Sequence, residues 1–191
     1  MGGVVSQDLA TVQAPRAAMD LHWASSHVFD VVGAWAGESD SPAVAVSMAT
    51  TSRHLSWRVA DLQELIPEPE ADQDDDPPAQ LHPRLAGALD AIRAIPGTAE
   101  RLGITHRVLL PRLAVECVNM ERGAKPDEEP DPVVVIAGAL LGDLRRDRDD
   151  GEVLLAKLII DVAMVQQVGE RVLEAERRLV EAGGLVPVSV T

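Results

Sequence analysis

Residues 41–66, SPAVAVSMATTSRHLSWRVADLQELI, decide the fold class most clearly. The segment opens with a serine, a good helix N-cap, and a proline suited to the first helical position. Its apolar side chains then recur every three or four residues, as along one face of an α-helix. They are Val44, Met48, Leu55, Val59, Leu62 and Ile66, with Thr51 in the same register. The pattern predicts an amphipathic helix that ends before Pro67.

The same spacing recurs along most of the chain. It predicts further helices over residues 15–35, 83–95, 98–122, 133–144 and 149–182. Pro111 is expected to kink the helix that contains it, because proline lacks the N–H that the helical hydrogen-bond ladder needs. Four long helices and two shorter ones with short connections indicate an all-α fold, a helical bundle that runs up and down.

Charged and small residues mark the ends of the last helix. The charged run 145–150 predicts a turn before it. Asp149, with Glu152 three residues later, resembles a capping box. The glycine pair 183–184 is expected to terminate the helix. The apolar stripe predicted to face the core consists of Leu154, Leu158, Val162, Val165, Val172 and Leu179.

Residues 133–144 fit two secondary structures, because they are apolar throughout. Their first four, Val133–Ile136, are β-branched and would suit a buried strand. Asp131 and Pro132 before them form a helix start. We favour a buried helix, because no other segment offers a partner strand of comparable strength.

Composition also favours helices in a single domain. Aromatic residues make up only 2% of the chain, which weighs against a β-sandwich or barrel. The single cysteine, Cys117, excludes an intramolecular disulfide and a zinc site built mainly on thiolates. We expect one bundle domain over residues 15–184, an N-terminal arm at 1–14 and an extended tail at 185–191.

The chain is acidic, with a formal net charge of −14. Residues 67–82 hold six acidic residues, four prolines and no basic residue, and they predict a disordered loop inserted in the bundle. The negative charge disfavours binding to nucleic-acid phosphates. The longest uncharged apolar run, 132–142, is far shorter than the roughly 20 residues that span a bilayer, so we expect a soluble protein.

Residue usage also suggests an origin and a location. Arginine outnumbers lysine fifteen to two, and alanine and valine are abundant, which is typical of a GC-rich bacterial genome. The first 14 residues have neither a basic nor a continuous apolar region of a signal peptide. We therefore expect a cytoplasmic bacterial protein.

The histidines provide a candidate metal site. His22, His54 and His106 fall on three different predicted helices, and a bundle could bring them together around a metal or a small ligand. Of the three, only His106 falls in register with the apolar stripe of its helix. Single histidines on helices are more often polar residues with a structural role. The Glu-x-x-His motif of carboxylate-bridged di-iron bundles does not occur in the sequence. We therefore favour no metal and expect no cofactor.

Glu116 and Asp161 could support such a site. Asp161 interrupts an apolar run, so it either faces outward or is buried with a partner. Lys157 stands four residues earlier, and we favour a surface ion pair between the two. The alternative is a buried acid that lines a pocket beside a histidine or arginine of a neighbouring helix.

The tryptophans divide between core and surface. Trp35 continues the apolar stripe of its helix, which indicates core packing. Trp23 and Trp57 lie off the main stripes, and tryptophan is enriched at protein interfaces. These two residues are our interface candidates.

No catalytic residue can be assigned. The sequence has no Walker loop, no Gly-x-Ser-x-Gly and no His-Glu-x-x-His. We interpret the chain as a non-enzymatic interaction, assembly or accessory protein that binds a protein partner or itself. The alternative is a ligand- or metal-binding bundle with a histidine-lined central pocket.

Overall fold

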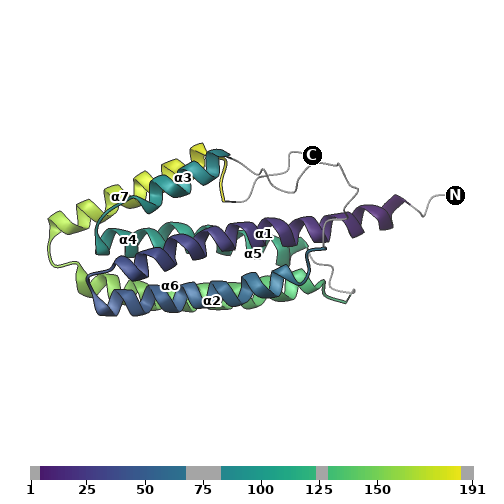
Figure 1. Cartoon of the computed structure of the whole chain (residues 1–191), viewed down its shortest axis with the longest axis horizontal. Helices are drawn as coiled ribbons and strands as arrows, with labels where there is room; N and C mark the ends of the chain where they lie inside the picture. The colour runs from purple at the N-terminus through teal and green to yellow at the C-terminus, as the bar shows by residue number, and fades with distance from the viewer. Residues whose placement is uncertain (1–4, 68–82, 124–128, 186–191) are drawn as a thin grey trace.

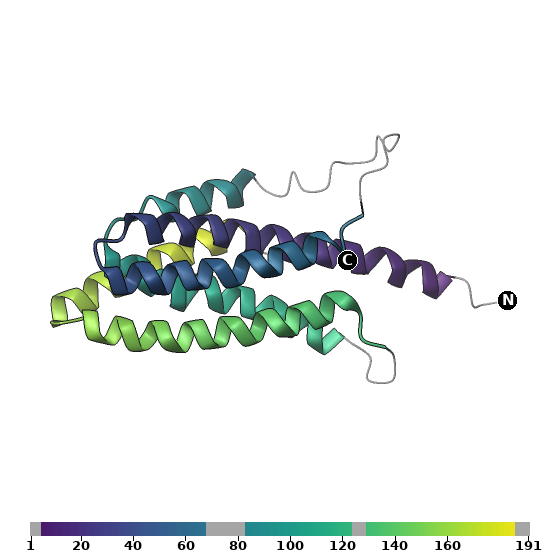
Figure 2. The same ribbon diagram turned by 60° about the horizontal axis from the view of Figure 1, so that its bottom comes forward.

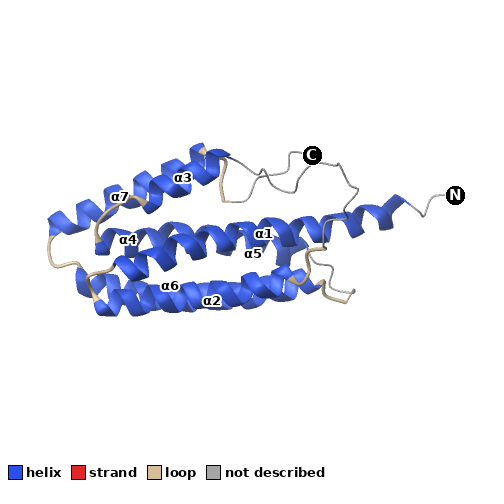
Figure 3. Cartoon of the chain, viewed as in Figure 1, coloured by secondary structure: helices blue, strands red, loops and turns tan. Residues whose placement is uncertain are grey.

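The computed structural model describes residues 5–67, 83–123 and 129–185. These residues are mostly helical and contain no strand, so the all-α prediction is confirmed (Figure 3). The elements are α1 (Val5–Glu38), α2 (Pro42–Gln63), α3 (Pro83–Arg93), α4 (Thr98–Ile104), the π-helical turn η1 (Thr105–Leu109), α5 (Leu110–Gly123), α6 (Pro132–Leu158) and α7 (Val162–Glu181). The predicted acidic loop, apart from Pro67, and the tail beyond Leu185 lie outside the described residues.

The rods alternate in direction along the chain, as expected for an up-and-down bundle, with α4, η1 and α5 forming one rod (Figure 1). α1 packs along α2, α2 along α6, and α6 along α5, and these contacts form the main body of the bundle. α1 and α2 lie side by side in both views (Figure 2). α7 packs on α4 and α3, at the side of this body.

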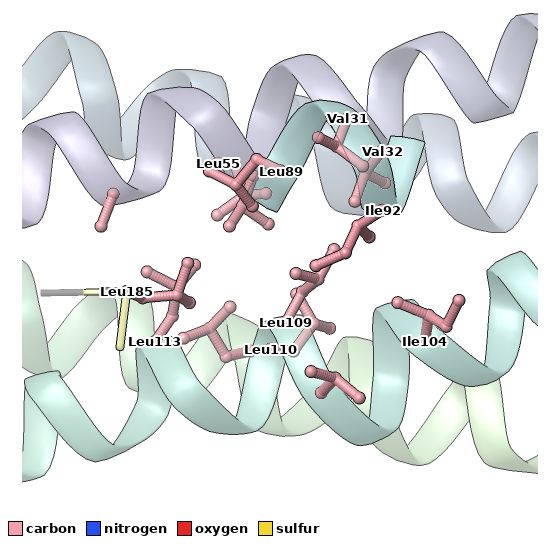
Figure 4. Close-up of a cluster of buried hydrophobic side chains, with 14 of the residues drawn as sticks. Val31, Val32, Leu55, Leu89, Ile92, Ile104, Leu109, Leu110, Leu113 and Leu185 are labelled. Carbon is pink, nitrogen blue, oxygen red and sulfur yellow. The ribbon is translucent and has the colours of Figure 1, made fainter. Parts of the chain in front are cut away.

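The core consists mainly of aliphatic side chains. Figure 4 shows part of it, in which side chains from α1, α2 and α3 meet those of the α4–α5 rod. The labelled residues are Val31, Val32, Leu55, Leu89, Ile92, Ile104, Leu109, Leu110, Leu113 and Leu185. Trp35 is the largest fully buried side chain, and its indole N–H donates to the carbonyl oxygen of Arg93 at 3.0 Å. This bond ties α1 to the end of α3 and satisfies the polar atom of a core residue.

The N-terminal helix is longer than the sequence predicts. α1 begins at Val5, so residues 5–14 are helical, where the sequence pattern indicates an arm. Extending an existing helix adds one hydrogen bond per residue, and Leu9, Ala10 and Ala14 are good helix formers. Such an extension needs no apolar stripe of its own, which is why periodicity misses it.

α6 runs without interruption through the charged residues 145–150, where the sequence predicts a turn. The face of α6 that points into the core continues through this run. Its buried residues are Leu144, Asp147, Gly151 and Leu155. The other residues of the run are exposed, and charge on an exposed face is compatible with a helix. The predicted turn and the predicted capping box at Asp149 are therefore wrong.

The chain turns instead at residues 159–161, and Asp161 begins the last helix. Its carboxylate accepts a hydrogen bond from the N–H of Met164 at 2.8 Å, which caps α7. Asp161 is exposed, and the predicted ion pair with Lys157 is not among its described contacts. The buried-acid alternative for Asp161 is wrong as well, because the carboxylate lies on the surface.

The irregularity expected at Pro111 lies one turn earlier, in η1. There the N–H of Leu110 donates to the carbonyl oxygen of Thr105, five residues back. In a regular α-helix a proline ring clashes with the carbonyl group four residues before it, and a π turn is one way in which a helix accommodates such an irregularity. The rod therefore continues past the proline, and His106 is placed within the π turn.

Two of the predicted helix starts differ in their capping. Asp131 accepts a hydrogen bond from the N–H of Val133 at 2.9 Å, and α6 follows directly. Residues 133–144 are therefore a helix and not a strand. Ser41 precedes α2 as expected, but its side chain makes no capping hydrogen bond.

The predicted end of the last helix is confirmed. Gly183 and Gly184 both have positive φ angles, of 96° and 100°. The N–H of Gly184 donates to the carbonyl oxygen of Leu179 at 2.8 Å, and that of Gly183 to Val180 at 3.1 Å. This pair of bonds is a Schellman motif, which needs residues that tolerate left-handed backbone.

We expect the substitution Asp161→Ala to destabilise the fold by about 1 kcal/mol, because it removes the α7 cap. The matched control is Asp149→Ala, an exposed position inside α6 that should change stability by less than about 0.5 kcal/mol. Urea unfolding followed by circular dichroism measures both. A larger loss of stability for Asp149→Ala than for Asp161→Ala would instead support the predicted capping box at Asp149.

Candidate functional site

A small set of polar side chains is buried in the described part of the bundle. They are Ser25, Thr51, Ser52, Glu100, Thr105, His106 and Asp147. Several have partners close by: Thr105 donates to the carbonyl oxygen of Arg101 at 2.9 Å, and Glu100 accepts from the amide of Gln167. Burial of a polar group costs free energy unless it is hydrogen-bonded, so the two residues with unusual environments, Asp147 and His106, are the places to look for chemistry.

Asp147 of α6 binds His54 of α2. The Nδ1 atom of His54 lies 3.0 Å from both carboxylate oxygens, and the hydroxyl of Thr51 also hydrogen-bonds the carboxylate. Burial raises the pKa of Asp147, and the hydrogen bonds from His54 and Thr51 oppose that rise. One turn away, the guanidinium of Arg58 donates to Asp143 at 3.0 and 3.1 Å. These two contacts hold α2 on α6.

A carboxylate that orients an imidazole can also activate a nucleophile. Within the described residues, however, no hydroxyl or thiol hydrogen-bonds to His54. Cys117 is buried, and burial raises the pKa of its thiol to about 12, so the thiolate is scarce at neutral pH. The contact between His54 and Asp147 links α2 to α6.

His106 is fully buried in η1, in register with the core as the sequence pattern indicates. Among the described residues, neither of its ring nitrogens has a hydrogen-bond partner. The imidazole lies directly on Gly151 of α6, where a Cβ atom would collide with the ring. Burial lowers the pKa of His106 to about 4, so the ring is neutral at physiological pH.

The three histidines singled out in the sequence lie in separate environments. His54 is bonded to Asp147, His106 lies on Gly151, and His22 is half-buried on α1 with a pKa lowered by burial. In the part of the chain that the structure describes, no group of three or more His, Cys, Asp or Glu residues could hold a metal ion. 

The two acids suggested as support also have other surroundings. Asp161 caps α7 on the surface. Glu116 is half-buried on α5, beside Asn119 and Arg112, and burial raises the pKa of its carboxyl. Each of the two acids therefore has local contacts of its own that account for its position in the fold.

The two interface candidates differ in exposure. Trp23 packs against the core and stacks on His27, with ring centroids 4.0 Å apart. Trp57 is 52% exposed on α2, and the guanidinium of Arg53 lies 5.4 Å from its ring centroid. Trp57 alone of this pair presents a large part of its ring to solvent.

α7 carries a row of exposed apolar residues that sequence reasoning missed. Val162, Val165, Leu173 and Val180 are 72%, 51%, 64% and 60% exposed. We call these four residues the α7 stripe. At 3.6 residues per turn they share one face of the helix, next to the face that buries Val168, Ala175 and Leu179. Within the described residues, α7 thus carries four exposed apolar side chains beside the face that it packs on the bundle.

The sequence pattern assigns Val162 and Val165 to the core stripe of the last helix and does not single out Leu173 or Val180. The signal that could have revealed the second face is the number of apolar positions on α7, which exceeds what one buried face needs. Periodicity identifies an apolar face but does not tell which face the rest of the bundle covers.

One edge of the α7 stripe is charged. A surface groove of about 540 Å³ runs along it, lined by Leu173 and by charged residues that include Glu170 and Arg177. Within the described residues, neither Glu170 nor Arg177 makes an ion pair. By contrast, Glu174 binds Arg171 at 2.7 Å and Arg178 at 2.8 Å. The two uncompensated charges lie beside exposed apolar residues, as in the rim of an interface.

Comparison with known proteins assigns no family to this geometry. No family model, no curated protein and no solved structure matches the chain. None of the described helices combines the length and the apolar composition that crossing a membrane requires.

We expect Gly151→Ala to destabilise the fold by about 1–3 kcal/mol, because the added methyl group would collide with the imidazole of His106. Gly142→Ala, at an exposed position of the same helix with open space around it, should instead stabilise by about 0.5–1 kcal/mol. Thermal and urea unfolding of both variants measure the difference. Similar effects at the two positions would contradict the close contact between η1 and α6.

His106 should make the fold sensitive to acid. Because its pKa is lowered from 6.5 to about 4 in the folded chain, the unfolded chain binds a proton below pH 6.5 that the folded chain does not. The free energy of unfolding should therefore fall between pH 6.5 and 4, by about 3 kcal/mol from this residue. His106→Leu should flatten this dependence and leave stability at neutral pH equal or higher, because no unpaired nitrogen remains. His27→Gln is the control and should keep the dependence.

Proposed function

We propose that the protein is a non-enzymatic helical interaction module, an assembly or accessory subunit that binds a protein partner through the α7 stripe. The observation that carries this proposal is the exposure of Val162, Val165, Leu173 and Val180 on one face of a single helix. Contiguous exposed apolar residues with a polar rim are typical of protein interaction sites. Glu170 and Arg177 supply such a rim.

The environments of the other candidate residues support the same proposal. The carboxylate of Asp147 and the ring of His54 are used to join α2 to α6. The thiol of Cys117 is buried with a raised pKa. The exposed apolar residues of α7 are a feature that the stability of the single chain does not require, because burying them would need another molecule.

A second candidate function is a ligand- or metal-binding bundle, and His106 is the observation that favours it. Its ring nitrogens are buried and unpaired, so a small polar ligand could hydrogen-bond to them. Native mass spectrometry and elemental analysis of protein purified without a histidine tag distinguish the two functions. A bound small molecule or a stoichiometric metal that is lost in His106→Leu would favour the second function, and protein that carries neither would exclude it.

Site-specific photocrosslinking tests the interaction module. We expect a photoreactive amino acid at position 173 to form protein adducts in cells that express the chain, because Leu173 lies at the middle of the α7 stripe. The control is position 135 on α6, where Val135 is equally accessible but isolated from the stripe. Mass spectrometry of the adducts identifies the partner. Equal adduct yields at the two positions, or none at position 173, would refute docking through α7.

A further inference from the structure

We propose that the partner of the α7 stripe is a second copy of this chain, with the two α7 helices antiparallel across a two-fold axis at Leu173. The inference rests on the proposed function and names its partner. A two-fold dimer uses the same surface on both copies, so the surface must be self-complementary in shape and in charge. α7 meets both requirements.

Three of the four stripe residues are arranged nearly symmetrically about Leu173, and Val162 lies beyond this set, towards the start of the helix. Val165 lies eight residues before it and Val180 seven residues after it. In the antiparallel pair, the two Leu173 side chains meet at the axis, and Val165 of each copy lies opposite Val180 of the other. The opposed valines differ in height by about one residue, or about 1.5 Å, so they can interdigitate.

The charges on the stripe's edge are complementary in the same arrangement. Glu170 lies three residues before Leu173, and Arg177 lies four residues after it. Antiparallel helices related by a two-fold axis place the same edges together, so Glu170 of each copy faces Arg177 of the other. Neither side chain has an ion-pair partner within the described residues, and the second copy supplies one for each.

The centre of the stripe also allows close approach. Gly169 lies between Val165 and Leu173, and the space where its Cβ would stand is open. The aliphatic part of Arg177 from the second copy falls opposite this glycine and can pack against it. The contact uses one helix of 20 residues from each copy, about 30 Å long, so the interface is small and a micromolar Kd is expected.

Analytical ultracentrifugation of the full chain tests the dimer. The parent protein should pass from monomer to dimer across the micromolar range. Leu173→Asp should weaken dimerisation at least about thirtyfold, because it places two carboxylates at the axis. The matched control is Val135→Asp, at an exposed valine on α6, which should leave the Kd unchanged. Circular dichroism checks that both variants keep the parent's helicity.

A charge exchange tests the antiparallel pairing. Glu170→Arg and Arg177→Glu should each weaken the dimer about tenfold or more, because each places like charges opposite one another twice. An equimolar mixture of the two variants should dimerise again as a heterodimer, in which both pairs have opposite charges. The double variant should dimerise like the parent. Restoration by mixing requires pairing between copies and would not occur for a contact within one chain.

Three results would overturn the inference: a monomer throughout the micromolar range, a dimer that Leu173→Asp leaves intact, or single charge variants that do not recover on mixing. A monomer whose position 173 still crosslinks to a different protein would leave the proposed function in place and remove only the second copy as partner. A monomer without adducts at position 173 would remove both.

Discussion

The buried face of α6 is the constraint on which the rest of the structure depends. Asp147 and Gly151 occupy consecutive turns of that face, and each contacts a different neighbouring element. The carboxylate of Asp147 holds α2 through His54, and the bare backbone of Gly151 admits the ring of His106 from the π turn. Because both positions must face inward, α6 has to continue as a helix through its most charged residues. The turn to α7 is thereby delayed to residues 159–161.

The π turn η1 packs against the buried face of α6. Pro111 prevents a regular helix, and the wider turn before it keeps the rod continuous while placing His106 against α6. The cost is an imidazole with no hydrogen-bond partner, held neutral by burial. Stability alone does not explain a histidine there, since an apolar side chain of similar size would avoid unpaired nitrogens.

The proposed function places the interaction site where the bundle leaves a helix face uncovered. The main body closes on itself through α1, α2, α6 and α5, whereas α7 packs on α4 and α3 and leaves an apolar face uncovered. An uncovered face can be covered by another molecule at little cost to the fold, because the core residues of α7, Val168, Ala175 and Leu179, lie on a different, adjacent face of the helix. The same separation makes the α7 variants suitable tests, since exposed positions can be changed without opening the core.

The sequence alone determined the all-α class, most helix positions, the Asp131 and Gly183–Gly184 signals and the inward register of His106, because capping and periodicity are local properties of the chain. It misplaced the start of α1 and the break between α6 and α7, and it took Val162 and Val165 for core. Only the tertiary structure decided these points and paired His54 with Asp147. Whether a charged run ends a helix, or an apolar face is buried, depends on which other helix lies against it, and spacing along one segment does not contain that information.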